Sequence, residues 1–163
     1  MFPTYFQRLA AYNRWANGLL YDAAAEVKDD DYHRDIGAFF GSLHGTLTHL
    51  AVTDRIWLRR LTGEGESHPQ LDAQPWADFA SLRAVREAED QRIIDWTAAL
   101  TDADFTQDFH YANMAGTPFT DRLDLLAAHF FNHQTHHRGQ AHGLLSSLGH
   151  APPSLDLIYF SRL

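Results

Sequence analysis

The sequence predicts an all-α fold, a four-helix bundle with a short ribbon or loop before the last helix. Four long segments carry apolar residues at helical spacing, and no internal repeat or low-complexity stretch interrupts them. With 163 residues, 45% of them hydrophobic, the chain can bury one core but is too short for two domains of ordinary size. We therefore expect a single domain over residues 1–163.

The expected helices span residues 3–27, 36–61, 76–100 and 120–149. The first begins at Pro3, because a proline in the first turn lacks only an N–H that would have no helical partner. An acidic stretch, 28–31, separates it from the second helix. The second helix ends before Gly63 and carries Arg59 and Arg60 in its last turn, where the helix dipole favours cations.

The third helix follows a long polar connection, residues 63–75, and its apolar side chains fall within an arc of about 100°. Residues 105–119 then alternate partly between apolar and polar, which predicts a small two-stranded ribbon or an irregular loop. Thr120 is an acceptable N-cap for the fourth helix, and Gly149 ends it. The apolar tail 155–160 is expected to pack on the bundle or on a second subunit.

The fourth helix contains four of the eleven histidines: His129, His133, His136 and His137. His133 and His137 are one turn apart and lie within an arc of about 60° among apolar side chains. Buried imidazoles lose water as a hydrogen-bond partner, and one shared divalent ion would serve both. They could instead be core histidines bonded to neighbouring groups. His129 and His136 lie off this line, as flanking groups or ordinary surface histidines.

Two histidines make an incomplete site, because catalytic zinc and similar ions normally take three protein ligands and keep one position open. The chain has no cysteine, so the ligands must be nitrogen or oxygen. The second helix offers His44 and His49. His49 shares its face with Val52 and Ile56, whereas His44 points about 140° away, so His49 is the better candidate.

Charge and hydropathy exclude some partners. Thirteen basic and twenty-one acidic residues give a net charge of -8, which opposes binding to a nucleic-acid backbone. No leader-like segment and no apolar run long enough to cross a membrane occur, so we expect a cytoplasmic protein without a membrane partner. The eleven phenylalanines, four tryptophans and six tyrosines are many for a bundle of this size, and a homodimer would cover part of that surface.

Three segments resemble those of a known family: Ala11 to Asn17, Leu47 to Leu61 with its histidine, aspartate and tryptophan, and the HxxxHRGQ-like run His133 to Gln140. Over nearly its whole length the chain is similar to the DinB/YfiT superfamily of small metal-binding helical bundles. This is the damage-inducible DinB family, not the DNA polymerase that shares the label. The resemblance implies a four-helix bundle with an unusual connection order, commonly dimeric, with a divalent metal on His49, His133 and His137.

The family includes enzymes that use a low-molecular-weight thiol and others described as metal-dependent hydrolases. The resemblance therefore implies a metal-dependent enzyme that activates a thiol or water against a small electrophilic substrate. The alternative is a non-enzymatic stress-related protein in which the metal is structural. Zinc or nickel is favoured, iron and manganese stay open, and a thiol cosubstrate is expected only for the transferase type. Candidates for substrate positioning or proton transfer, each open to a purely structural reading, are Tyr12, Asn13, Asn17, Glu89 and Arg138.

Acid should weaken such a site. Histidine binds a metal only as the neutral imidazole, so protons compete with the ion. From the ordinary histidine pKa of about 6.5, we expect metal affinity to fall as the pH approaches and passes that value.

Overall fold

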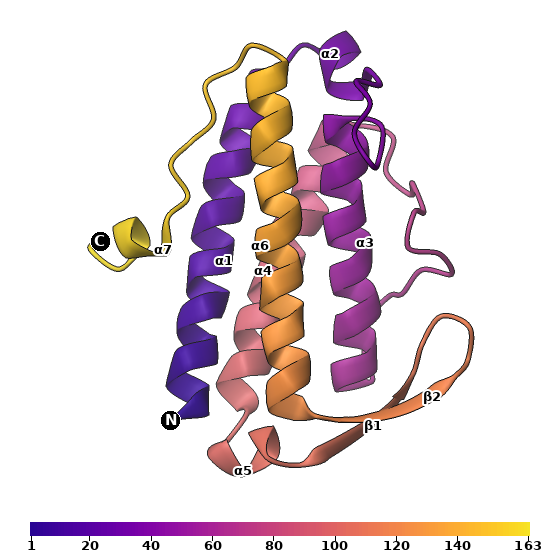
Figure 1. The fold of residues 1–163 in the computed structure, drawn as a ribbon, viewed down its shortest axis with the longest axis vertical. Coiled ribbons are helices and arrows are strands. Elements are labelled where there is room, and N and C mark those ends of the chain that lie inside the picture. The colour runs from indigo at the N-terminus through magenta and orange to yellow at the C-terminus, as the bar shows by residue number, and fades with distance from the viewer.

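The computed structural model describes residues 1–163, and most of the chain is helical (Figure 1). The long helices are α1 (Phe2–Ala25), α3 (Leu43–Thr62), α4 (Phe79–Ala99) and α6 (Leu123–Ser147). The short helices are α2 (Asp29–His33), α5 (Asp102–Phe105) and α7 (Leu157–Phe160). A small sheet consists of β1 (Asp108–Ala112) and β2 (Pro118–Arg122).

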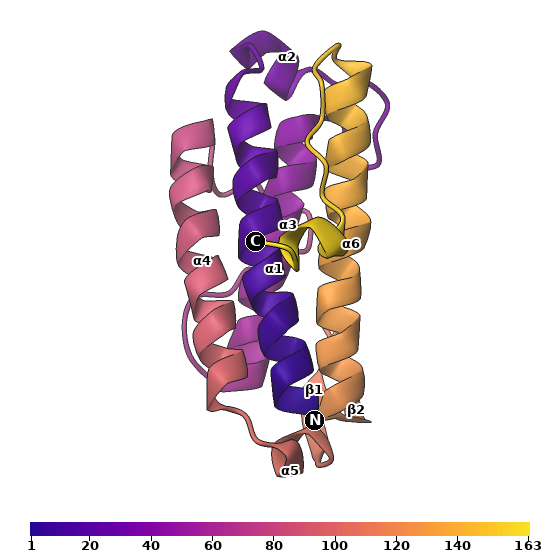
Figure 2. The same ribbon diagram turned by 90° about the vertical axis from the view of Figure 1, so that its left-hand side faces the viewer.

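The long helices lie side by side around a common interior (Figures 1 and 2). Helices α1 and α3 each pack against both α4 and α6. Helices α1 and α6 run in one direction, and α3 and α4 run in the other (Figure 1). The connection from α3 to α4, residues 63–78, must therefore run back along the helices, and we call it the crossover segment. None of the helices could span a membrane, because none is both long and apolar enough.

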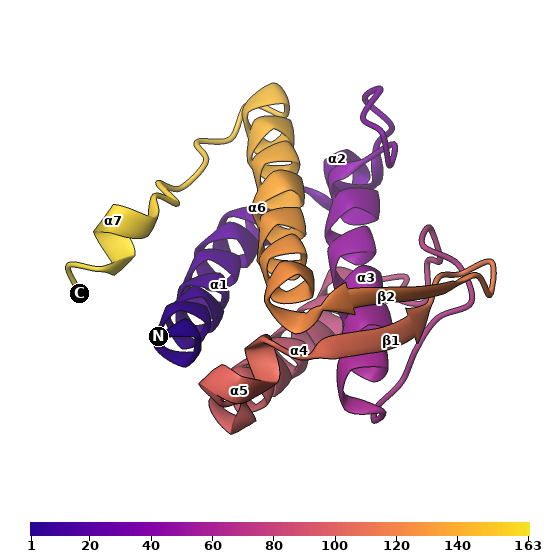
Figure 3. The same ribbon diagram turned by 60° about the horizontal axis from the view of Figure 1, so that its bottom comes forward.

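The ribbon predicted before the last helix is confirmed as an antiparallel hairpin, in which His110 pairs with Thr120. The hairpin lies across α3 and points toward the crossover segment (Figure 3). Trp57 of α3 contacts Tyr111 of β1, with ring centroids 5.5 Å apart. The hairpin therefore covers part of the side of α3 that it contacts.

The interior divides into two apolar clusters with a polar layer between them. One cluster includes Leu20, Leu47 and Leu82, and the other includes Phe6, Leu58 and Phe130. Along each long helix some buried polar residues fall between these clusters in sequence, and we call this set the polar layer: Asn13, Asn17, Asp54, Arg86, Asp90, Gln134 and Arg138. The predicted apolar stripes are thus interrupted at the same level on all four helices.

The predicted start of the second helix at residue 36 is wrong, because α3 begins at Leu43. Gly37 and Gly41 have φ values of +80° and +75°, which a continuous right-handed helix does not allow. Ser42 then caps α3, and its hydroxyl accepts a hydrogen bond from the Gly45 N–H at 3.0 Å. The acidic stretch before this turn forms the short helix α2.

The starts of the third and fourth helices also move. Helix α4 begins at Phe79, because the Asp78 carboxylate accepts the Ser81 N–H at 2.8 Å and caps the helix there. Thr120 is not a helix cap, because it belongs to β2, and α6 begins at Leu123. In each case a local side-chain or strand bond fixes a boundary that hydrophobic spacing leaves open.

Candidate metal centre

Three histidines from two helices meet where α3 faces α6. One nitrogen from each of His49, His133 and His137 lies within 4.8 Å of the other two. The ring centroids are 4.5 Å apart for His49 and His137, 5.3 Å for His49 and His133, and 4.3 Å for His133 and His137. The structure therefore brings together the three residues that helical phase selects, and they could hold a metal ion.

Hydrogen bonds at the outer ring nitrogens orient two of these imidazoles. The His49 Nδ1 lies 2.9 Å from the Leu71 carbonyl oxygen, which can only accept, so Nδ1 carries the proton. The His137 Nδ1 donates to the Gln140 side-chain oxygen at 2.7 Å. In both rings the Nε2 lone pair is therefore available to bind a metal ion at the centre of the cluster. Metal-binding histidines typically donate their other N–H to an oxygen in this way.

An aromatic side chain covers one side of the cluster. Phe40 stacks on His49 with ring centroids 3.9 Å apart and contacts His137 at 5.5 Å. The absence of a side chain at Gly45 permits this arrangement, because a Cβ there would lie 2.1 Å from the Phe40 carbonyl oxygen. The turn that displaces the start of α3 therefore also positions an apolar shield on the histidines.

Burial lowers the pKa of all three histidines. The pKa of His49 falls to about 4, mainly by desolvation, with a smaller effect from His137. Desolvation and the neighbouring histidines lower the pKa of His133 to about 3, and burial also lowers that of His137. All three imidazoles are therefore neutral at pH 7, the form that a metal requires. The centre has no carboxylate or thiolate, and an all-imidazole set suits zinc, nickel, copper or iron.

These pKa values lower the pH range in which we expect acid to weaken the site, compared with the range that the ordinary histidine pKa predicts. In the unfolded chain the histidines titrate near pH 6.5, so their contribution to stability is full above that pH and is lost as the pH falls through about 4 and 3. Competition between protons and metal in the folded protein should begin only in that lower range.

We expect calorimetric titration with Ni²⁺ at pH 6, in buffers of different ionisation enthalpy, to show release of fewer than about one proton per ion. Three imidazoles with the ordinary pKa would together release about two. Release of two or more protons would show that burial does not hold these histidines neutral.

The remaining histidines lie outside the centre. His44 is buried beside Tyr32 and lies 4.5 Å from His33 between ring centroids, away from the cluster as predicted. The His129 ring lies 6.1 Å from that of His133 and flanks it. The His136 Nε2 accepts from the Gln140 amide at 3.3 Å, so it contacts a group that orients His137.

A cleft of about 460 Å³ opens directly beside the centre. His49 and His133 form part of its wall, together with Trp57 and Arg60 of α3 and Met114 of the hairpin turn. The volume falls in the range of small-molecule sites. His49 is only 5% exposed, whereas His133 is partly exposed. The histidine cluster is therefore open to this cleft on one side.

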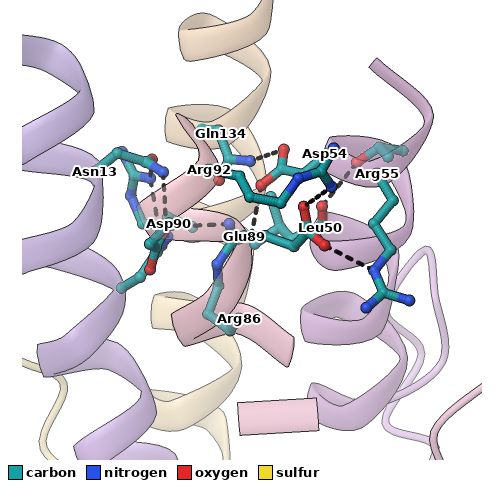
Figure 4. A network of polar contacts seen from close by, with 12 residues as sticks. Asn13, Leu50, Asp54, Arg55, Arg86, Glu89, Asp90, Arg92 and Gln134 are labelled. Atoms are coloured by element: carbon teal, nitrogen blue, oxygen red, sulfur yellow. Dashed lines mark hydrogen bonds and ion pairs between the residues drawn. The ribbon is translucent and has the colours of Figure 1, made fainter. Parts of the chain in front are cut away.

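The five predicted positioning residues do not line this cleft. The Tyr12 hydroxyl donates to the Leu155 carbonyl at 2.6 Å, and Tyr12 and Arg138 line a separate cavity under the C-terminal tail. The side-chain amides of Asn13 and Asn17 donate to Asp90 at 3.2 and 2.8 Å in the polar layer (Figure 4). Their involvement in chemistry stays a prediction, and their contacts are those of a structural network.

Two of these residues, Glu89 and Arg138, are buried charged groups with different kinds of partner. Glu89 is 3% exposed and accepts from Arg55 at 2.9 Å and from Arg92 at 2.6 Å (Figure 4). Arg138 is 3% exposed, donates to Asn13, and lies over the Tyr12 ring at 5.2 Å. Glu89 is thus a buried ion-pair partner. Arg138 is buried in contact with uncharged groups.

Sequence reasoning missed several residues that shape the site. Gln140 could have been found, because it is three positions after His137 on the same helix and side chains at that spacing are neighbours. Leu71 could not, because its contribution is a backbone carbonyl in the crossover segment. Apolar spacing places Phe40 in a helix, and the position of Arg60 in the last turn of a helix indicates only an interaction with the helix dipole.

Comparison with known proteins finds sequence similarity along the chain. A sequence model described as "DinB family" matches residues 1–163. A curated protein named "Protein DinB", from Bacillus subtilis (strain 168), is 24% identical over 155 residues, which cover 91% of this chain and 89% of that protein. The similarity therefore extends over nearly the full length of both chains.

Proposed function

The chain belongs to the DinB family, and from this premise we propose that it binds one divalent ion through His49, His133 and His137 and acts as a metal-dependent enzyme. The observation that carries the proposal is the position of the histidine cluster at the wall of a cleft of ligand size. A purely structural ion, the second possibility, is usually enclosed by four protein ligands. Here three imidazoles are present and one side faces the cleft.

When bound, a divalent ion in such a site acts as a Lewis acid that makes a thiol or a water molecule nucleophilic near neutral pH. The residues of this chain prepare the site for that role. Burial keeps the three imidazoles neutral, and Leu71 and Gln140 fix the direction of two of them. Phe40 excludes water from one side, so a small molecule must approach from the cleft.

We further propose zinc or nickel as the metal ahead of iron or manganese, and a small electrophilic substrate. A low-molecular-weight thiol would be the cosubstrate if the enzyme is a transferase or isomerase, and water if it is a hydrolase. We interpret the four long helices as a single four-helix bundle domain of the DinB type.

Activity can be tested with the metal-loaded protein, glutathione, bacillithiol or mycothiol, and an electrophile such as a haloarene or a maleyl compound. We expect thiol consumption, or hydrolysis of the electrophile without thiol, that is lost with a chelator and in the His137→Ala variant. Activity equal in loaded and chelated protein would contradict the proposal. A bound ion with no turnover in any of these assays would favour the structural role.

We also propose a cytoplasmic homodimer in which the C-terminal tail lies at the interface. Phe160 packs on Trp15 with ring centroids 5.7 Å apart, while Leu157, Ile158 and Tyr159 remain 40, 53 and 46% exposed. Neighbouring apolar side chains of this exposure are common at interfaces. Light scattering should give twice the monomer mass of 18.5 kDa at micromolar concentration, and the monomer mass would contradict the dimer.

A further inference from the structure

Arg60 has no anionic partner in this structure, although the chain is rich in carboxylates. Helix α3 carries three arginines near its end, and each has a different environment. Arg55 pairs with Glu66 and with Glu89, the latter at 2.9 Å. Arg59 is exposed to solvent. Arg60 is only partly exposed, and none of the ion pairs in the protein includes it.

The contacts of Arg60 are weak ones for a guanidinium. Its Nη2 lies 3.2 Å from the Met114 sulfur, and a thioether is a poor acceptor. The guanidinium lies over Trp57 at 4.9 Å and over Tyr111 at 6.0 Å. Desolvation lowers its pKa from the ordinary value. Arg60 has thus lost part of its hydration without gaining the carboxylate or phosphate that its planar donors match.

The cleft beside the histidines offers no competing acid. Arg60 forms part of its wall, and no aspartate or glutamate lines it, in a chain with 21 acidic and 13 basic residues. Three histidines, His49, His129 and His133, also form part of the wall. On the other side of Arg60, Asp121 lines a neighbouring cleft but accepts the Tyr111 hydroxyl at 3.0 Å. The walls of the histidine cleft also include the apolar side chains of Trp57, Leu71 and Met114.

We propose that this cleft binds a small organic anion, whose carboxylate or phosphate group is held by Arg60 and whose apolar body lies along Trp57 and Leu71. The other end of such a molecule would face His49 and His133. This inference rests on the proposed function for the identity of the molecule as a substrate. The contact between the anion and Arg60 does not depend on the metal. The proposal defines the class of substrate that the cleft selects, a small organic anion.

The probes are benzoate, phenyl phosphate and benzyl alcohol, which share a ring and differ in charge. Binding is followed by the NMR signal of the Trp57 indole N–H, assigned with a Trp57→Phe variant. Titrations use metal-free protein, so that an anion cannot bind at a metal instead. The variants are Arg60→Met and, as the matched control, Arg59→Met, which removes the same charge from the adjacent exposed position.

We expect at least one of the two anions to bind the parent, and to bind Arg60→Met more weakly by about tenfold or more, because hydrogen bonds to a charged group are stronger than those between neutral groups. Arg59→Met should stay within about twofold of the parent, because long-range charge effects are screened. The anion whose affinity falls more in Arg60→Met shows whether the group that Arg60 holds is a carboxylate or a phosphate. Benzyl alcohol should bind all three proteins weakly and equally.

Equal anion affinity in the two arginine variants would overturn the inference, as would failure of both anions to bind the parent. Thermal melts and metal content of Arg60→Met should match those of the parent, which separates loss of the anion contact from loss of folding. If the parent binds no metal, the proposed function fails, but the metal-free titrations still decide whether Arg60 binds an anion.

Discussion

Replacing His133 with alanine is expected to lower the affinity for a divalent ion by more than about 100-fold. Loss of a residue that only orients a ligand typically lowers metal affinity about 10- to 100-fold, and this substitution removes one of the three ligands themselves. At an ion concentration 100 times the parent dissociation constant, bound metal should stabilise the parent by about 2.7 kcal/mol and the variant by at most about 0.4 kcal/mol. Thermal melts with saturating ion and with chelator measure the difference.

The matched control for this substitution is His142→Ala. His142 belongs to the same helix but lines the separate cavity beneath the C-terminal tail. Its replacement should leave the metal-dependent increase in melting temperature unchanged. If metal raises the melting temperature of His133→Ala as much as that of the parent, His133 is not a ligand.

Replacing Arg86 with methionine should cause the largest loss of stability, about 3–5 kcal/mol, in urea unfolding of the chelated protein. Arg86 is 2% exposed and forms ion pairs with Asp54 at 2.5 Å and with Asp90 at 3.0 Å (Figure 4). Methionine fills much of the space but leaves two buried carboxylates without the arginine that pairs with both. Burial already raises the pKa of Asp54 to about 6 against the opposing effect of Arg86, and removing that arginine should raise it further.

The pH dependence distinguishes this explanation from a packing defect. A carboxylate whose folded pKa lies above its unfolded value favours the folded state at low pH and loses that advantage as the pH rises through the folded pKa. The deficit of Arg86→Met should therefore be smaller at pH 5 than at pH 8. As a control, Arg83→Met in the same helix breaks only surface pairs with Asp22 and Glu87 and should cost less than about 1 kcal/mol. Equal losses in both variants, or a deficit independent of pH, would contradict the account.

The histidine cluster could be predicted because its members lie on long helices, where residue spacing fixes direction. His133 and His137 share a face four residues apart, so periodicity selects them. The need for a third ligand points to another helix, and helical phase there favours His49 over His44. The hairpin could also be anticipated from alternation. Both signals are local, and tertiary packing left them intact.

What the sequence did not show depends on non-local contacts. Ile36 and Phe40 continue the apolar spacing of α3, but the backbone turns between them, and Phe40 then lies on His49. Arg86 and Asp90 have the i, i+4 spacing of an exposed helix pair, yet they are buried, and the third partner, Asp54, comes from another helix. Spacing shows which face a residue occupies, not which neighbour that face meets.

X-ray absorption spectroscopy of the zinc-loaded parent protein tests the central claim most directly, because it reports the ligands themselves. The account predicts one zinc ion per chain with three imidazole nitrogens at about 2.0–2.1 Å and at least one further light ligand, such as water, in the open position. A first shell with only one or two imidazoles, or one dominated by carboxylate oxygens, would contradict a three-histidine centre at His49, His133 and His137.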